Sequence, residues 1–219
     1  MFYIIGMIEI KNTQVFGLER TIKASGNSFS VGEIDTLAPI TDRDIKRASR
    51  LGGCQLPNQS HDSFLKGIIV QFDIKYPQYW TPESQRYHWF EIVMSASKMH
   101  RLVTEALQPV KQFREKFNEF VDEDVVQKVH WYAEQRDKAD TPEKKHYWFM
   151  KALSNLPMGY ELWETVSTNY LQLKTIYTQR HNHELKEDWG TFCEWCLTLP
   201  KFTELTGCGR EKENEALQV

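Results

Sequence analysis

The run from Leu156 to Arg180, LPMGYELWETVSTNYLQLKTIYTQR, holds the residues best suited to binding a planar or anionic ligand. Charges are few along this run, and Arg180 ends it. In apolar surroundings a guanidinium is weakly screened, so it attracts an anion or a polarised ring strongly. This composition therefore indicates a buried anion or a polarised ring close to Arg180.

The same run predicts a helix, because its residues recur at the steps of three and four that mark one helix face. That face comprises Leu162, Thr165, Val166, Asn169, Tyr170, Leu173, Ile176 and Tyr177. It is apolar apart from Thr165 and Asn169. If Asn169 is buried, its amide needs hydrogen-bond partners. A bound ligand and a neighbouring turn of the protein are both candidates, and the pattern leaves the choice open.

A second group of basic and hydroxyl side chains follows Tyr79. The start signal Thr81-Pro82-Glu83 predicts a helix over residues 81 to about 106. The side chains that return to one side of this helix are Glu83, Arg86, Tyr87, Ser97, Lys98 and Arg101. The planar fork of arginine and the point charge of lysine suit phosphate binding. The alternative is a solvated polar face on which Glu83 pairs with Arg86.

Four further side chains, His181, His183, Cys193 and Cys196, are of the types that bind tetrahedral zinc. The two cysteines fall inside a predicted helix over residues 188–199, where free cysteine more often packs as a small apolar side chain. A dithiol redox role has less support, because no βαβ pattern surrounds the CxxC. We expect no metal site, and zinc at these four residues stays an alternative.

Sequence motifs of other common enzyme classes are absent. The chain has no GxGxxG loop, no Walker sequence, no GxSxG elbow and no HExxH pair. Nucleophilic hydrolysis therefore has no support from the sequence.

Length and composition indicate one globular domain over residues 1–209, followed by a solvated tail at residues 210–219. The chain has 219 residues, of which 41% are hydrophobic and 26% charged, as in ordinary globular proteins. Its net charge of −3 gives no general attraction to nucleic acid, so no nucleic-acid partner is expected.

The opening MFYIIGMIEI has neither a basic region nor a cleavage site, and no apolar run approaches the length of a membrane span. We interpret it as a first strand in a cytoplasmic protein. Four cysteines, at positions 54, 193, 196 and 208, are too few for a disulfide scaffold in a chain of this size, so reduced thiols are expected.

Local patterns predict strands first and helices later. A hairpin is expected over residues 2–10 and 13–17, and a further strand over 67–75. Predicted helices cover residues 41–51, 81–106, 109–121, 124–137, 156–180 and 188–199, with one more beginning at Thr141-Pro142-Glu143.

Short motifs in the first half resemble those of the flavin-dependent thymidylate synthases, the ThyX family, in strongly diverged form. Ala24–Phe29 resembles the family segment Ala-Arg-x-Ser-Phe with the arginine replaced. His61–Phe64 is similar to His-x-Ser/Thr-Pro-Phe but one residue short, and Phe72–Pro77 resembles a strand ending in Phe-His-Val-Lys-Ala-Pro.

Counted onward from Pro77, the family signature Arg-His-Arg falls on Arg86-Tyr87-His88, and its preceding Gln falls on Glu83. Only the first arginine is kept. The family's later Ser-x-Arg-Tyr is similar to Ser95–Met99, with Lys98 in place of the arginine, and its Asn-Glu pair is replaced by Val93-Met94.

In the second half, Leu156–Tyr160 resembles the family opening Leu-Pro-x-x-x-Tyr. The helix that follows matches so that Asn169 lies at the family's flavin-side Asn and Arg180 at its nucleotide-side Arg. The resemblance covers most of the chain, and no single motif is intact.

The resemblance implies an α+β protomer in which a small antiparallel sheet from the N-terminal half packs with a mainly helical C-terminal half. It also implies a homotetramer with shared active sites that bind FAD, a dUMP-like pyrimidine nucleotide and methylenetetrahydrofolate, with NADPH as reductant. The flavin contacts implied are Ser28, His61, His88 and Asn169. The nucleotide contacts implied are Glu83, Arg86, Ser97, Lys98 and Arg180. Arg180 is the implied catalytic residue, facing the uracil ring.

Two functions from different classes remain. The first is a thymidylate synthase-like flavoenzyme, favoured by the match at Asn169 and Arg180. The second is a catalytically degenerate scaffold that binds a nucleotide or a protein partner without turnover, favoured by the lost signature residues.

Overall fold

The structure is a computed structural model that describes residues 8–53 and 61–210. The start of the predicted hairpin, Cys54 and all but the first residue of the predicted tail lie outside the described residues. By its internal packing the chain divides into two compact units. Unit 1 comprises Met1–Ile74, Gln85–Val93 and Thr165–Val219, and unit 2 comprises Lys75–Ser84 and Met94–Glu164. Among the described helices, none is long and apolar enough to cross a bilayer.

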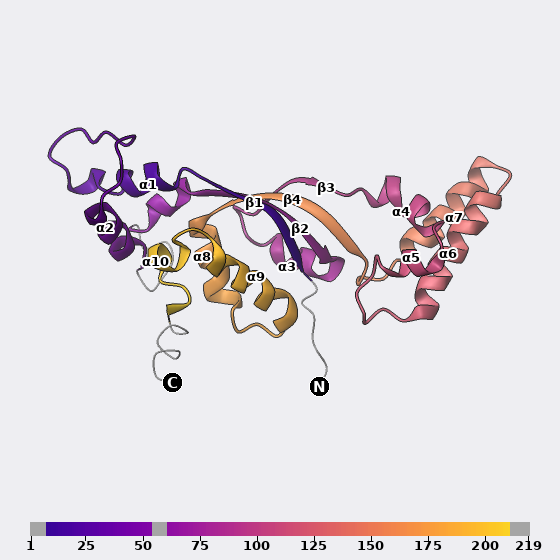
Figure 1. Cartoon of the computed structure of the whole chain (residues 1–219). Helices are drawn as coiled ribbons and strands as arrows, with labels where there is room; N and C mark the ends of the chain where they lie inside the picture. The colour runs from indigo at the N-terminus through magenta and orange to yellow at the C-terminus, as the bar shows by residue number, and fades with distance from the viewer. Residues whose placement is uncertain (1–7, 54–60, 211–219) are drawn as a thin grey trace. The chain divides into compact units, whose positions relative to one another are not determined.

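The sheet has four antiparallel strands in the order β1-β2-β4-β3 (Figure 1). These are β1 (Glu9–Phe16), β2 (Ile69–Pro77), β3 (Glu91–Ser95) and β4 (Glu161–Asn169). With helices making up most of the remaining structure, the chain belongs to the predicted α+β class. The boundary between the units falls inside β2, β3 and β4.

Asp73 of β2 fixes the register of three strands in unit 1. Its carboxylate accepts a hydrogen bond of 2.7 Å from Asn12 Nδ2 of β1 and one of 2.7 Å from Thr165 Oγ1 of β4. These two bonds, opposed by burial, hold the pKa of Asp73 below its usual range. The predicted hairpin break at residues 11–13 is wrong. β1 runs through it with Asn12 at φ 53°, a left-handed conformation that asparagine tolerates.

Unit 1 combines its part of the sheet with several helices and an aromatic core. Its longer elements are α1 (Leu18–Ala24), α2 (Asp42–Gly52), α8 (Tyr170–Arg180), α9 (Lys186–Thr198) and α10 (Phe202–Thr206), with 3-10 turns at Asn27–Phe29 and Ser63–Gly67. The rings of Phe72, Phe90 and Phe192 lie 6.0–6.2 Å apart, and the ring of Trp195 lies 4.4 Å from that of Phe72. Their burial supplies much of the hydrophobic stabilisation of this unit.

Unit 2 is built on a helical hairpin. α6 (Glu123–Lys138) and α7 (Pro142–Ser154) pack against each other, as Figure 1 shows, and α4 (Lys98–Ala106) and α5 (Val110–Arg114) pack beside them. The short α3 (Thr81–Ser84) follows a 3-10 turn at Gln78–Trp80. Apolar side chains from α4, α5, α6 and α7 share one buried core. Two phenols in this unit, Tyr76 and Tyr160, donate short hydrogen bonds to Glu164 and Glu105.

Two predicted helices are wrong, because each predicted range contains a strand. The prediction over residues 156–180 is helical only from Tyr170, because β4 occupies the preceding residues. There Glu164, Val166 and Thr168 are buried at every second position, before the strand ends at the buried Asn169. β-branched residues favour this pleated geometry. The same apolar residues can fit both the three- and four-residue spacing of a helix and the two-residue spacing of a strand. Hydrogen bonding to β2 and β3 selects the strand here.

The helix predicted over residues 81–106 divides in the same way. α3 ends at Ser84, β3 follows, and only α4 is helical again. The backbone N–H of Ala96 donates to the carbonyl of Trp163 over 2.9 Å, so pairing with the β4 segment replaces helical bonds here. The helix predicted at 109–121 contracts to α5, whereas those at 41–51, 124–137 and 188–199 and the start at Thr141 are confirmed within two residues.

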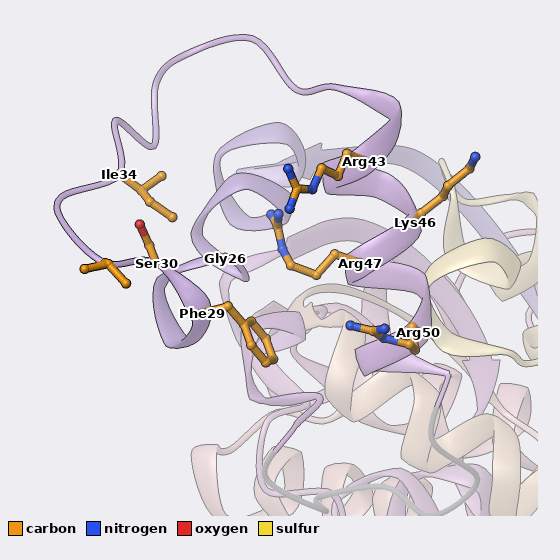
Figure 2. Close-up of a pocket in the computed structure, with 9 residues that line it drawn as sticks. Gly26, Phe29, Ser30, Ile34, Arg43, Lys46, Arg47 and Arg50 are labelled. Carbon is orange, nitrogen blue, oxygen red and sulfur yellow. The ribbon is translucent and has the colours of Figure 1, made fainter.

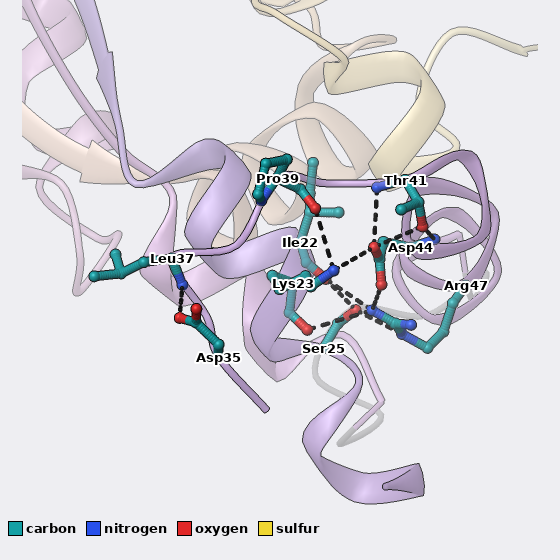
Figure 3. A network of polar contacts seen from close by, with 9 residues as sticks. All are labelled: Ile22, Lys23, Ser25, Asp35, Leu37, Pro39, Thr41, Asp44 and Arg47. Carbon is teal, nitrogen blue, oxygen red and sulfur yellow. Dashed lines mark hydrogen bonds and ion pairs between the residues drawn. The ribbon is translucent and has the colours of Figure 1, made fainter. Parts of the chain in front are cut away.

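The N-terminus of α2 is held by a compact polar network in unit 1 (Figure 3). Thr41 and Asp44 cap the helix reciprocally, with the Asp44 N–H donating to Thr41 Oγ1 over 3.3 Å and the Thr41 N–H donating to Asp44 Oδ2 over 2.9 Å. The same carboxylate accepts from Lys23 Nζ at 3.0 Å and from Arg47 Nη2 at 2.8 Å. Burial opposes ionisation of Asp44, but these bonds outweigh it and hold its pKa well below the usual range.

Asp44→Asn is expected to lower the free energy of unfolding by about 1.5–3 kcal/mol at pH 7, the scale of hydrogen bonds to a charged group. A carboxylate whose pKa is lowered on folding stabilises the protein fully above its unfolded pKa of about 3.9, and this contribution is lost as pH falls. The difference between the two proteins should therefore shrink below about pH 4. Urea denaturation at several pH values measures it.

The matched control is Asp42→Asn, because Asp42 lies two residues earlier on the same helix and is exposed. Its loss should stay within about 1 kcal/mol, the scale of a helix-dipole contact. Equal losses in the two variants, or a difference that persists unchanged at pH 3, would contradict the role given to Asp44.

Candidate functional site

Arg180 is the last residue of α8, as the sequence predicts, and its guanidinium lies among aromatic groups of unit 1. Its Nε donates to the hydroxyl of Tyr87 over 2.7 Å. The guanidinium carbon lies 4.9 Å from the ring centre of Trp189 and 5.6 Å from that of Tyr87. The side chain is half-buried, so its charge is only partly screened by water. This environment agrees with the expected apolar surroundings of Arg180.

Tyr87 links Arg180 to the rest of α8. Its hydroxyl accepts from Arg180 and donates to Gln179 Oε1 over 3.1 Å. Nearby in the same segment, the backbone N–H of Trp89 donates to Gln172 Oε1 over 3.2 Å. Two α8 glutamines thus anchor residues 87–89, which fixes the ring of Tyr87 against the guanidinium. No local pattern in the sequence points to Trp189 or Gln179, because the contact of Trp189 with Arg180 and that of Gln179 with Tyr87 depend on tertiary packing.

Asn169 is the last residue of β4 and the N-cap of α8, and it is buried. Its Oδ1 accepts a hydrogen bond of 2.9 Å from the backbone N–H of Gln172. Both interpretations from the sequence therefore keep some support. A turn of the protein satisfies the amide oxygen, while Nδ2 makes no hydrogen bond to any described residue and remains able to donate to a ligand.

The other expected flavin contacts, Ser28, His61 and His88, are exposed and belong to unit 1, like Asn169. Ser28 lies in the 3-10 turn after α1, and His61 lies in a turn before the next 3-10 segment. His88 follows Tyr87, and its ring meets that of Trp89 edge-on at 5.0 Å. All three present hydrogen-bonding groups to solvent.

The expected nucleotide contacts divide between the two units. Arg86 belongs to unit 1, where it is exposed in a turn after α3. Glu83, Ser97 and Lys98 belong to unit 2 and are half-buried. Lys98 Nζ donates to Gln78 Oε1 over 2.5 Å, and Ser97 stands at the N-cap of α4 without a side-chain cap bond. The single helix face expected to carry Glu83, Arg86 and Tyr87 is absent, because α3 ends at Ser84.

Zinc binding by His181, His183, Cys193 and Cys196 gains no support from the geometry. Within residues 8–53 and 61–210, no group of three or more His, Cys, Asp or Glu side chains is placed to hold a metal ion. Both cysteines are buried on α9, and burial raises the pKa of the Cys196 thiol. The ring of His181 stacks on that of Tyr177. A neutral buried thiol is a poor ligand and a poor nucleophile.

Chemically, Arg180 offers a fixed positive charge beside aromatic faces, and Asn169 offers two amide donors at the other end of α8. Such groups can bind and polarise a planar anionic or carbonyl-bearing ring. Neither is a nucleophile, so any covalent chemistry at this site must come from a bound group.

Comparison with known proteins gives one kind of match. No protein-family model matches the chain, and no curated protein sequence matches it. Two solved structures of flavin-dependent thymidylate synthase ThyX from Helicobacter pylori, both with FAD and dUMP, are similar to it. The first has a TM-score of 0.64 at 18% identity and covers 92% of this chain and 98% of its own. The second has a TM-score of 0.61 at 17% identity and covers 91% and 95%. The chain therefore has a ThyX-like fold.

Proposed function

We propose that the protein is a flavin-dependent thymidylate synthase-like enzyme. It would transfer a one-carbon group from methylenetetrahydrofolate to C5 of dUMP or a related pyrimidine nucleotide, with NADPH as reductant. It would act in the cytoplasm as a homotetramer with active sites shared between protomers. The observation that carries the proposal is a ThyX-like fold over nearly the whole chain, with Arg180 and Asn169 kept at the ends of one helix.

The donor groups of unit 1 fit FAD. Asn169 is buried yet keeps its amide Nδ2 without a hydrogen bond to the described residues, and a flavin carbonyl would satisfy it. Ser28, His61 and His88 add exposed donors that would hold the rest of the cofactor. FAD, when bound, supplies the redox and carbon-carrying chemistry that no side chain of this site can supply.

The protein's own part is binding and electrostatics. Arg180 would face the uracil-like ring and stabilise negative charge that develops on it, a role that needs a preorganised cation. Tyr87 and Trp189 hold the guanidinium in place before the ligand arrives. Arg86 of unit 1, and Ser97 and Lys98 of unit 2, are each proposed as phosphate contacts, and Glu83 of unit 2 as a further nucleotide contact. These groups bind and orient the reactants and move no carbon themselves.

A catalytically degenerate scaffold is the second candidate, and one observation favours it. The Nε–H of Arg180 already donates a hydrogen bond to Tyr87. Tyr87 stands where the family signature has histidine. A guanidinium held in this way still has other N–H groups, but fewer remain for a ligand. This reading keeps nucleotide binding and removes turnover.

The test first records the colour of the full chain purified without added FAD, and then follows the FAD-loaded, NADPH-reduced protein in a stopped-flow assay. The first reading predicts a yellow protein whose flavin reoxidation depends on both dUMP and methylenetetrahydrofolate, with light scattering giving a tetramer. A colourless monomer, or reoxidation indifferent to dUMP, would reject it. A tetramer that binds dUMP without turnover would select the scaffold.

A further inference from the structure

An open cavity of about 900 Å³ lies in unit 1, against α2 and the loop after α1 (Figure 2). Its lining residues are Gly26, Phe29, Ser30, Val31, Ile34, Arg43, Lys46, Arg47 and Arg50. Four of them are cations on α2. Arg43, Arg47 and Arg50 follow one another at steps of four and three residues, so these three share a face. None of the lining residues is acidic, so the cavity attracts anions.

Arg47 is fixed in position before any ligand binds. Its Nε donates to Ser25 Oγ over 3.2 Å, and its Nη2 donates to the carbonyl of Ile22 over 3.2 Å and to Asp44 Oδ1 over 2.8 Å. Nη1 makes no hydrogen bond to the described residues. Gly26 permits this arrangement, since a Cβ there would lie 3.0 Å from the guanidinium carbon. Arg47 thus presents one preorganised edge of its fork.

Arg43 is exposed and makes no hydrogen bond or ion pair to the described residues. Figure 2 shows its guanidinium directed to the same side as that of Arg47, toward Ser30 and Ile34, whereas Lys46 extends away. Two adjacent guanidinium groups repel each other, and an anion between them removes this repulsion. The nearby carboxylate, Asp44, is already shared by Lys23 and Arg47.

Apart from Gly26 and Ser30, the rest of the lining is apolar and includes an aromatic ring. Phe29 is 59% exposed, and Val31 and Ile34 lie close to it in the chain. An exposed ring beside guanidinium groups suits a ligand with a flat ring attached to its phosphates. The cavity is in the size range of small-molecule sites and far larger than a single phosphate requires.

We propose that this cavity binds an organic diphosphate that carries a planar ring, the chemistry of a nucleoside diphosphate. Arg43 and Arg47 hold the phosphates, Arg50 adds a third positive charge, and Phe29 lies against the ring. Such a diphosphate has two sources, a free nucleotide or the adenosine diphosphate half of a dinucleotide such as FAD. The proposal stands on the cavity alone and does not require the thymidylate synthase-like function.

The probes are ADP, inorganic pyrophosphate and adenosine, titrated into the full chain by calorimetry at about 50 mM salt. ADP should bind most tightly, pyrophosphate more weakly, and adenosine not measurably. Arg43→Gln should weaken ADP binding by about ten- to a hundredfold, the scale of a lost charge-assisted hydrogen bond. Arg43 has no partner among the described residues, so the melting temperature of this variant should match that of the wild type.

Arg20→Gln is the matched control, since Arg20 is exposed on α1 and does not line the cavity. Unchanged ADP affinity in Arg43→Gln, or an equal loss in Arg20→Gln, would overturn the proposal. So would binding of an oligonucleotide or of anionic vesicles without binding of ADP. Phe29→Ala should lower the affinity for ADP to that for pyrophosphate. An unchanged ADP affinity in this variant would show that Phe29 does not contact the ring of the ligand.

FAD added to the ADP complex separates the two sources. Displacement of ADP by FAD, but not by riboflavin, assigns the cavity to the dinucleotide, and simultaneous binding assigns it to a free nucleotide. ADP binding by a protein without dUMP-dependent turnover would keep this site and reject the proposed enzyme. Turnover without ADP binding would keep the proposed enzyme and reject this site.

Discussion

Lys174→Met is expected to lower the free energy of unfolding by about 3–5 kcal/mol, because it removes the lysine that pairs with a buried carboxylate. Lys174 lies on α8 with 2% of its side chain exposed, and its Nζ bonds Asp62 Oδ2 at 3.0 Å and the carbonyl of Gly52 at 2.8 Å. The Asp62 side chain is fully buried. Removing one member of such a pair costs more than the pair contributes, since the other stays charged in a medium of low dielectric constant.

Guanidinium chloride denaturation of the two proteins measures this loss. Lys144→Met is the control, because Lys144 pairs with Asp140 at 2.8 Å on the surface of α7 and should lose no more than about 1 kcal/mol. The double variant Lys174→Met with Asp62→Leu should recover much of the stability, since apolar replacement of a buried pair is often neutral. A single variant within 1 kcal/mol of wild type, or a double variant no better than the single, would refute the account.

The pair of Lys174 and Asp62 shows why some contacts of the fold cannot be predicted from the sequence. Of the helix predicted over residues 156–180, the part from Tyr170 to Arg180 is correct, because local periodicity suffices there. Local periodicity cannot predict that a lysine is buried, because the partner carboxylate lies 112 residues earlier in the chain. Capping signals are local too, which is why the starts at Thr41 and Thr141 are predicted correctly and have their cap bonds.

The sequence pattern predicts helix where β3 and β4 lie, because a strand is not determined by local residues alone. Their assignment depends on which other strand lies alongside, and that information is spread over distant residues. Asn169 illustrates the effect on the site. The sequence places it on a helix face, whereas the structure makes it the junction between β4 and α8, where its oxygen caps the helix. The predicted helical setting of Asn169 is wrong, and its contact with a flavin stays a prediction.

The cations of α2 line a cavity, although the sequence pattern alone does not single them out as a site. Arg43, Lys46, Arg47 and Arg50 recur at helical spacing inside a correctly predicted helix, so the signal was present in the sequence. What the sequence could not supply was the loop carrying Phe29 and Ile34, which turns a charged helix face into a cavity. A basic helix alone is most often solvated, and only the enclosing wall makes it a candidate site.

Arg180→Lys is expected to slow the dUMP-dependent step of the proposed reaction by about ten- to a thousandfold, the scale of losing one preorganised donor to developing charge. Lysine keeps the charge, but it has no planar fork and no Nε–H to bond Tyr87. It also loses the flat contact with the ring of Trp189, which lies 4.9 Å from the guanidinium carbon. The cation would remain, while its position beside the ligand ring would not.

Stopped-flow flavin reoxidation in the presence of dUMP measures the rate, and thermal unfolding of each variant measures stability. Arg114→Lys serves as the matched control, because Arg114 bonds the backbone carbonyls of Phe117 and Asn118 in unit 2 and has no assigned role in binding. It should lower stability without changing the rate. If Arg180 only completes the C-terminus of α8, its replacement should leave the rate unchanged, as in this control. It should also leave stability nearly unchanged, since a helix-terminal cation contributes about 0.3–1 kcal/mol and lysine supplies one equally well. A slow Arg180→Lys protein with a near-normal melting temperature would therefore assign the guanidinium to the chemistry, and an unchanged rate would assign it to the helix end.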